Sequence, residues 1–435
     1  MFDLAERAVD LTIKEGASYA EAYISRSKKI EVKIEKDEIS LSKEKISKGI
    51  GIRAITKNRV GFAYTTDFEK IEDACRIAYK SSTKTRPDPD FKKLPGPEAP
   101  SKIKGTYDKR LRDLEVEECI DFSLKMLEGC KINPNISLTS GTATFALDEF
   151  AIVNSEGINC GEKGTFTSAY ITCSYIREPV TGDEYKASRF LDIEYEDVGN
   201  RCGRLVLDSL NPRKVESGVY NVVLSPFAVE DIFSFTLIPS LNSEAVYRKR
   251  SRLRGKINEE IAVKELNIMD DGTLAKGLNT SSIDSEGLPT KSTEIIKKGV
   301  LRSYFYDSYN AYRDGVESTG NSVRDSFRSV PGVGPTNFLI EEGKSEPIEE
   351  LKEGLLIKGI IGAHTSNPIT CDFSLETKNA FYIKDGSIEY PVKHAMLVGN
   401  ALDILKNIIS IGKDSEQVGS VFSPSILVEK MRVVA

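Results

Sequence analysis

The chain has 435 residues, of which 40% are hydrophobic and 29% are charged, and its formal net charge is −6. This length predicts two or three domains, and the composition is that of a soluble globular protein. The negative charge argues against a protein that binds nucleic acid through its overall field, and no apolar run reaches the roughly 18 residues of a membrane span.

The first 83 residues predict an N-terminal α+β domain. Residues 3–15 have apolar side chains at helical spacing, and Gly16 ends that helix. Alternating apolar and charged side chains then predict short antiparallel strands, and a second helix follows at residues 68–81. The predicted strands are residues 20–25, 30–35, 38–42, 49–55 and 60–65.

Residues 84–104 interrupt this pattern with five prolines. We expect an extended linker or a strap on the surface there, because proline favours extended backbone. Residues 105–214 then predict a central α+β domain. Its helices are expected at residues 116–127 and 194–210, and its strands at residues 137–145, 149–154 and 164–176.

Residues 215–435 predict a β-rich, barrel-like C-terminal domain, which completes an α+β fold class. One clear helix is expected at residues 226–237, with a short one at 347–353. Asp385-Gly386 predicts a hairpin turn, because glycine tolerates the positive φ that the turn needs. The expected strands are residues 219–224, 268–270, 293–297, 300–306, 338–342, 355–361, 380–383 and 388–392.

Seven cysteines are scattered along the chain without a Cys-x-x-Cys pair. Their odd number and their spacing argue against a disulfide framework and against a structural zinc site. The N-terminal helix also lacks the basic and apolar segments of a signal peptide. Together these features predict a cytoplasmic protein in a reducing compartment.

A polar cluster near the C-terminus stands out in an otherwise strand-rich region. The stretch from 354 to 400 contains both histidines of the chain, His364 and His394. His364 is followed closely by Asn367, Thr370 and Asp372. These side chains either line a cavity where an extended peptide binds, or bond to one another within a long turn.

The same stretch resembles a known family. HTSNPITCDFS (364–374), followed by NAFYIKDGSIEYPV (379–392), is similar to the C-terminal domain of the TldD/PmbA (TldE) family, also called modulator of DNA gyrase. The blocks GIGIRAITKNRVGFAYTTD (49–67), IVNSEG (152–157) and STGN (318–321) agree in order. The similarity is closer to the PmbA/TldE branch, although Cys371 stands where that branch normally has glycine.

The resemblance implies a metallopeptidase system. The TldD branch binds zinc through an H-E-x-x-x-H helix and a later cysteine, whereas the segment 227–243, where that helix should lie, contains no histidine. We therefore expect no cofactor on this chain and zinc on a TldD-like partner. The substrate-chamber candidates are His364, Asn367, Thr370, Asp372 and, from the STGN block, Asn321.

Two functional hypotheses follow. In the first, the chain is a PmbA/TldE-like subunit, without zinc ligands, of a TldD/TldE-type metalloprotease that acts on unfolded or short peptides. It then forms a heterodimer with the zinc-bearing chain and contributes the substrate chamber. In the second, it is a non-enzymatic regulatory protein that binds peptides or a partner, either alone or as a homodimer. Neither hypothesis involves nucleic acid or a membrane.

Three other patterns allow weaker alternatives. Cys371 and His364 could form a nucleophilic dyad, although free cysteine is usually a small buried side chain. The turn Asp270-Asp271-Gly272 could hold a cation together with Asp284 and Glu286, although a solvated turn is the simpler interpretation. The basic segment 247–254 is either a solvated helix face or partner contact, or a site for an anion or for the acidic groups of a peptide.

Overall fold

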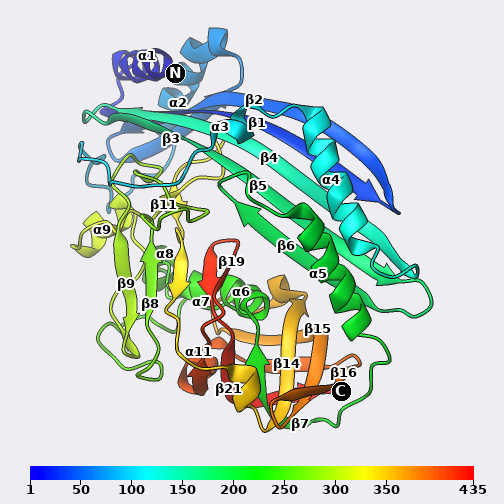
Figure 1. The fold of residues 1–435 in the computed structure, drawn as a ribbon. Helices are drawn as coiled ribbons and strands as arrows, with labels where there is room; N and C mark the ends of the chain where they lie inside the picture. Colours follow the sequence, from blue (N-terminus) through cyan, green and yellow to red (C-terminus); the bar gives the residue numbers. More distant parts are fainter.

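The computed structural model describes residues 1–435, and its first half is built on one six-stranded antiparallel sheet (Figure 1). The strand order is β3-β2-β1-β4-β5-β6. The predicted units 1–83 and 105–214 both contribute strands to this sheet, because β1 pairs with β4 along most of its length. The strands are β1 (Tyr19–Glu35), β2 (Glu38–Thr56), β3 (Arg59–Thr65), β4 (Ile136–Asn154), β5 (Asn159–Tyr175) and β6 (Thr181–Ser188).

Helices cover one side of this sheet. α1 and α2 pack on the even-numbered β1 residues around Ala22, and α4 and α5 pack on those around Val32. Because strand side chains alternate, Glu21 and Tyr23 point to the opposite side, which faces the C-terminal half. None of the helices is long and apolar enough to cross a membrane. The helices of this half are α1 (Phe2–Lys14), η1 (Phe68–Lys70), α2 (Ile71–Ser82), α3 (Lys109–Asp113), α4 (Val116–Cys130) and α5 (Tyr195–Asp208).

The prediction of short strands is wrong for β1 and β2. The segments predicted at 20–25 and 30–35 belong to one continuous strand, β1, and those at 38–42 and 49–55 belong to β2. In β1, the polar run Ser25 to Lys29 separates the two apolar segments, so the sequence does not show that the strand is continuous. Its backbone pairs with β2 on one side and β4 on the other, so hydrogen bonding continues where apolar alternation stops.

The C-terminal half contains a closed five-stranded barrel, as the sequence predicted. β14, β7, β21, β17 and β15 follow one another, and pairing of β15 with β14 closes the ring. The helix α6 packs against it through Val229 and Phe233. The hairpin turn is confirmed: Asp385 and Gly386 have φ of 47° and 75°. The strands are β7 (Gly218–Leu224), β14 (Glu353–Ile361), β15 (Asp372–Lys384), β16 (Ser387–Val392), β17 (Met396–Asn400), β18 (Ile408–Ile411) and β21 (Ile426–Val434).

A second C-terminal sheet lies beside the barrel, with strand order β10-β9-β8-β13-β20-β19. Its strands are β8 (Ile268–Asp271), β9 (Ser292–Lys297), β10 (Val300–Leu301), β13 (Phe338–Ile340), β19 (Glu416–Val418) and β20 (Val421–Ser423), and β11 (Ser322–Val323) pairs with β12 (Gly332–Val333). The helices of this half are α6 (Pro226–Phe235), α7 (Leu237–Ser240), α8 (Ser243–Tyr247), α9 (Ser308–Asp314), α10 (Pro347–Glu350), η2 (Ala363–Thr365) and α11 (Ala401–Lys406).

Two predicted elements of this half end earlier than expected. The helix expected at 226–237 breaks at Thr236, where φ is −130°, into α6 and α7. Pro239 explains the break, because its ring would clash with the carbonyl one turn earlier. The strand expected at 300–306 ends at Leu301, after Val300 and Leu301 have paired with β9. Phe305 instead forms an isolated bridge to Asn242.

The proline-rich segment 84–104 is an extended strap that touches both halves. The backbone N–H of Asp88 donates to the Asn58 carbonyl at 2.6 Å, and that of Ser101 donates to the Ser282 carbonyl at 2.9 Å. Phe91 and Leu94 are buried against Ile55. The strap therefore fastens the N-terminal sheet to the C-terminal half.

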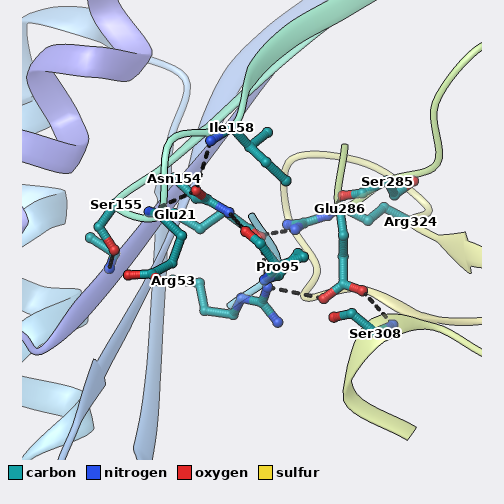
Figure 2. Close-up of polar contacts among 12 residues, drawn as sticks. Glu21, Arg53, Pro95, Asn154, Ser155, Ile158, Ser285, Glu286, Ser308 and Arg324 are labelled. Carbon is teal, nitrogen blue, oxygen red and sulfur yellow. Dashed lines mark hydrogen bonds and ion pairs between the residues drawn. The ribbon is translucent and has the colours of Figure 1, made fainter. Parts of the chain in front are cut away.

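A buried charge network joins the two halves where the sheet meets the loops after β8 (Figure 2). Glu21 of β1 and Arg53 of β2 are cross-strand partners, and their side chains bond at 2.6 Å. Arg53 also donates to Glu286 at 3.2 Å, and Arg324 donates to Glu21 from the far side. Glu286 in turn accepts the backbone N–H of Ser308 at 3.0 Å.

Most of the buried charged groups in this network have an oppositely charged or hydrogen-bonding partner. Burial acts to raise the pKa of Glu21, but the guanidinium groups of Arg324 and Arg53 outweigh it and hold that pKa below its ordinary value. Arg324 also donates from Nε to the Ser285 carbonyl and lies 4.9 Å from the centre of the Tyr23 ring. A lone charge would not remain ionised in this position.

We expect Glu21→Gln to destabilise the chain by about 3–5 kcal/mol, because it leaves two buried guanidinium groups around a neutral amide. Urea unfolding at neutral pH measures this change. The matched control is Glu72→Gln, since Glu72 pairs with Arg7 on the surface with both side chains more than half exposed. That variant should cost about 0–1 kcal/mol. Equal losses in the two variants would contradict the structural role of the network.

Candidate functional site

A cavity of about 880 Å³ lies between the edge of the N-terminal sheet and the barrel. One wall is the edge strand β6 with α5, and the opposite wall is α6 with β14 and β15 (Figure 1). The hairpin β19–β20 borders it through Glu416 and Val418. Its volume is typical of pockets that bind small molecules or peptide side chains.

Charged side chains of both signs line this cavity, with seven carboxylates against four cations. Lys378 of β15 bonds to Asp183 of β6 and so joins the two walls. Arg201 of α5 lies 3.4 Å from Glu184 of β6, within one wall. The carboxylates are Asp183, Glu184, Asp208, Glu230, Asp231, Asp414 and Glu416, and the cations are Arg201, Arg204, Lys358 and Lys378.

The two carboxylates on α6 form no ion pair. Glu230 accepts a hydrogen bond from the Ser234 hydroxyl at 2.8 Å, and Asp231 accepts one from the backbone N–H of Ile360 at 2.9 Å. Burial raises the pKa of Asp231 to about 7 against that hydrogen bond, and the charge of Glu230 adds to the rise. Burial also raises the pKa of Glu230.

Glu184 is the most buried acid of the cavity, with 7% of its surface exposed. Burial raises its pKa to about 7, Arg201 opposes the rise and Glu416 adds to it. One of its oxygens, Oε1, has no hydrogen-bond partner, and neither does Oδ1 of its neighbour Asp183. A buried carboxylate oxygen without a hydrogen-bond donor destabilises the folded state. These two oxygens are therefore free to accept hydrogen bonds from a ligand.

These residues are not among those predicted from the sequence. No strand is predicted at β6, because its sequence TGDEYKAS offers little apolar alternation. The strand forms because β5 pairs with it from Thr167 to Ser174. Glu230 and Asp231 could have been found from their position alone, because they lie in the helix where the resemblance places the zinc motif.

The predicted polar cluster forms a turn beside α7, outside the lining of the large cavity. Asn367 accepts backbone N–H groups from Ile369 and Thr370, and its own N–H donates to the Asp372 carbonyl. The Asp372 carboxylate accepts from the Asn400 amide at 2.7 Å. Asn367, Thr370 and Asp372 are therefore brought together by local hydrogen bonds, and their contact with a peptide stays a prediction.

The two histidines and Asn321 take no part in the hydrogen bonds of this turn. His364 is exposed in η2, and His394 is exposed before β17, where its Nδ1 lies 3.0 Å from Glu376. Asn321 is fully buried, and its amide donates to Asp270 and to the Gly334 carbonyl. The structure does not bring Asn321 to the turn or to the cavity.

The weaker alternatives can be placed as well. Asp270 is 1% exposed and accepts bonds from Asn321 and Thr336, so the expectation of a solvated turn is wrong for it. Across the chain, no three His, Cys, Asp or Glu side chains converge in a way that could hold a metal ion. Most of the basic segment 247–254 is exposed.

Cys371 occupies an unusual backbone position. Its φ is 64°, which is the left-handed conformation that glycine adopts easily, so the turn keeps that conformation although the side chain is not glycine. The thiol is buried 3.0 Å from the Ser240 hydroxyl and makes no hydrogen bond to a histidine. Burial raises its pKa. This geometry supports a packing role rather than a dyad with His364.

We expect Cys371→Gly to be more stable than Cys371→Ala by about 1 kcal/mol, because both lose the thiol but only glycine relieves the left-handed strain. At an ordinary position the order is reversed, with glycine about 0.5–1 kcal/mol less stable than alanine. Urea unfolding of the two variants decides between these orders. An alanine variant as stable as the glycine variant would contradict the strained backbone.

Glu184→Gln should stabilise the chain at about pH 8 and have little effect at about pH 4, because the pKa of Glu184 rises from 4.5 to about 7 on folding. The folded state binds an extra proton between these values, so the wild type loses stability as pH rises through them. The gain at high pH should be about 1–3 kcal/mol. Thermal unfolding at both pH values measures it, with Glu317→Gln as control, since that side chain is 95% exposed. A gain that does not change with pH would contradict the buried carboxylate.

Comparisons with known proteins cover almost the whole chain. Models of PmbA/TldA metallopeptidase domain 1, central domain and C-terminal domain match residues 20–82, 109–210 and 217–435. The uncharacterized protein MJ0231 of Methanocaldococcus jannaschii is 35% identical over 422 residues, which are 97% of this chain and 98% of that protein.

Two further relatives have names that refer to this family. Metalloprotease PmbA of Escherichia coli O157:H7 is 25% identical over 440 residues, covering 95% of this chain and 92% of its own. The crystal structure of TldE from Thermococcus kodakarensis superposes with a TM-score of 0.93 at 25% identity, covering 99% of this chain and all of that one.

Proposed function

The chain belongs to the PmbA/TldD metallopeptidase family, and from this premise we propose that it is the zinc-free subunit of a two-chain peptidase. Its partner is a TldD-like chain that holds zinc on an H-E-x-x-x-H helix. The pair acts on unfolded or short peptides in the cytoplasm. This chain closes the chamber and binds substrate.

The side chains of α6 are the observation on which this proposal rests. If Glu230 were the glutamate of the zinc motif, its two histidines would fall at positions 229 and 234. Those positions hold Val229, which is fully buried in the core, and Ser234, which bonds to Glu230. Neither supplies an imidazole, so we infer that this donor set does not fit zinc.

The remaining histidines do not compensate for this loss. His364 and His394 lie on separate surface turns, both exposed, and His394 faces Glu376. Cys371 is buried against α7 through Ser240. A zinc site needs several such ligands at about 2.0–2.3 Å from one point, and this arrangement does not provide them.

The cavity supports the substrate-binding half of the proposal. It lies directly over α6, so a chain without zinc ligands still has a pocket where the catalytic helix of a relative would be. Its lining includes aromatic and aliphatic side chains beside the charges, among them Tyr185, Phe227 and Phe381. Such mixed linings suit peptides, whose backbone needs hydrogen bonds and whose side chains need apolar contact.

Mixing the purified chain with the TldD-like protein of the same organism tests the proposal. We expect the two to elute together in gel filtration and to cut an unfolded polypeptide, while this chain alone cuts nothing. A partner whose motif glutamate is replaced by glutamine should abolish the activity of the mixture.

Cleavage by the lone chain would overturn the proposal. Absence of both association and cleavage in the mixture would also overturn it. The second outcome would favour a non-enzymatic peptide- or partner-binding protein, either alone or as a homodimer.

A further inference from the structure

The basic segment 247–254 concentrates positive charge on a chain whose net charge is −6, and the subunit role does not explain it. Within this segment, Arg248 is paired with Glu244 of α8. Its other cations are all exposed, and their side chains form no ion pair or hydrogen bond within the chain. These unpaired cations are Lys249, Arg250, Arg252 and Arg254.

Buried anchors hold the unpaired cations in place. Ser251 and Leu253 alternate with the arginines and are only 8% and 2% exposed. The Ser251 hydroxyl donates to the Ser240 carbonyl of α7 at 2.6 Å, and the Leu253 carbonyl accepts from the Tyr304 hydroxyl. The fold therefore fixes several like charges within one short turn, where they repel one another until an anion neutralises them.

The basic segment adjoins the polar turn at residues 364–372. Ser240 links the two, because its carbonyl accepts from Ser251 while its own hydroxyl donates to the Pro368 carbonyl at 3.1 Å. A ligand on the basic segment therefore lies beside this turn.

One acid of the turn lies in the field of these cations. Hydrogen bonds from Thr370 and Asn400 lower the pKa of Asp372, and the charge of Arg252 lowers it further. Asp372 and Arg252 nevertheless form no ion pair. The guanidinium group of Arg252 therefore keeps its N–H donors for a ligand.

The chemistry of the segment favours carboxylates over the phosphates of a nucleic acid. A guanidinium group binds a carboxylate through two parallel N–H bonds, and three of the four unpaired cations are arginines. Proteins that bind nucleic acid tightly make about six to ten phosphate contacts, which is more than this segment offers. The net charge of −6 also repels a long polyanion more than a short acidic peptide.

We propose that the basic segment binds the acidic side chains of peptides, with Arg250, Arg252 and Arg254 as the donors to their carboxylates. The inference rests on the proposed function in taking a peptide as the ligand. It adds a selectivity, because the chain then holds acidic peptides more tightly than neutral peptides of the same length.

Fluorescence anisotropy on the lone full-length chain tests the proposal with two labelled peptides of equal length, both blocked at their ends. The first carries several glutamates, and the second carries glutamine at the same positions. A labelled single-stranded oligonucleotide of the same charge is the third probe, so that peptide carboxylates can be told from nucleic-acid phosphates. All three are measured at low salt, because salt screens exposed charge pairs.

We expect the glutamate peptide to bind about tenfold more tightly than the glutamine peptide, because several exposed charge pairs, each weak alone, act together. The triple variant Arg250→Gln/Arg252→Gln/Arg254→Gln should lose this preference and keep its affinity for the glutamine peptide. Arg252→Gln alone should lower the preference about threefold, and it covers the case in which the triple variant does not fold.

The matched control is the triple variant Arg26→Gln/Arg86→Gln/Arg177→Gln. It removes the same total charge from three exposed arginines that lie in separate parts of the chain and form no ion pair. The preference for the glutamate peptide should survive in this variant, because the overall charge changes while the basic segment does not.

Equal affinity for the two peptides would overturn the inference. So would a preference that survives the loss of the segment's arginines, one that disappears equally in the control, or tighter binding of the oligonucleotide than of the glutamate peptide. A mixture that cuts peptides while the lone chain ignores their charge would overturn only the basic site. A charge-selective chain that never joins a TldD-like partner would overturn only the subunit role.

Discussion

The ion pairs around Glu21 are the constraint on which the relative placement of the two halves depends. One buried carboxylate accepts from two guanidinium groups, and one of these, Arg53, reaches across to Glu286. Charges buried this deeply must be paired or the structure does not form. The pairing therefore requires the N-terminal sheet and the C-terminal loops to meet in one orientation.

That orientation determines where the cavity lies. The network joins the β1–β2 side of the sheet to the C-terminal half, whereas β6 is the opposite edge strand of the same sheet. With one end of the sheet fastened by the network and the strap, the β6 edge stands over α6 and the barrel. Lys378 and Asp183 then bridge the gap at the rim. The cavity therefore lies between the β6 edge and the barrel.

The balance of charge differs between the Glu21 network and the cavity at β6. At the network, carboxylates and guanidinium groups alternate, and burial is tolerated because each Glu21 oxygen has an arginine donor. In the cavity, carboxylates outnumber cations and Glu184 keeps an open oxygen. The first pattern is typical of a structural contact and the second of a binding site, in which strain is retained where a ligand acts.

Much of the fold could be predicted from local sequence. The Asp385-Gly386 turn, the helix over α6 and the barrel-like C-terminal half depend on neighbouring residues, and these predictions are confirmed. The candidate cavity could not be found in this way. Glu184 lies on a polar edge strand that exists only because β5 pairs with it, and its burial depends on α5 and the barrel.

The Glu21–Arg53 pair shows the same limit. In the sequence these are two charged residues in strands, which by themselves predict a solvated face. Only the C-terminal segment around Glu286 and Arg324, more than 230 residues away from both, makes their side of the sheet an interior. Resemblance to a family identified the architecture, but the contacts that make the site are long-range.

Zinc content of the purified chain, measured by mass spectrometry of the metal after dialysis against a zinc-containing buffer, tests the central claim most directly. The account predicts no stoichiometric zinc on this chain, together with stoichiometric zinc on a TldD-like protein treated in the same way. One tightly held zinc per chain would contradict it, because it would mean that side chains other than imidazoles on α6 assemble a metal site, and the chain would then be a candidate peptidase by itself.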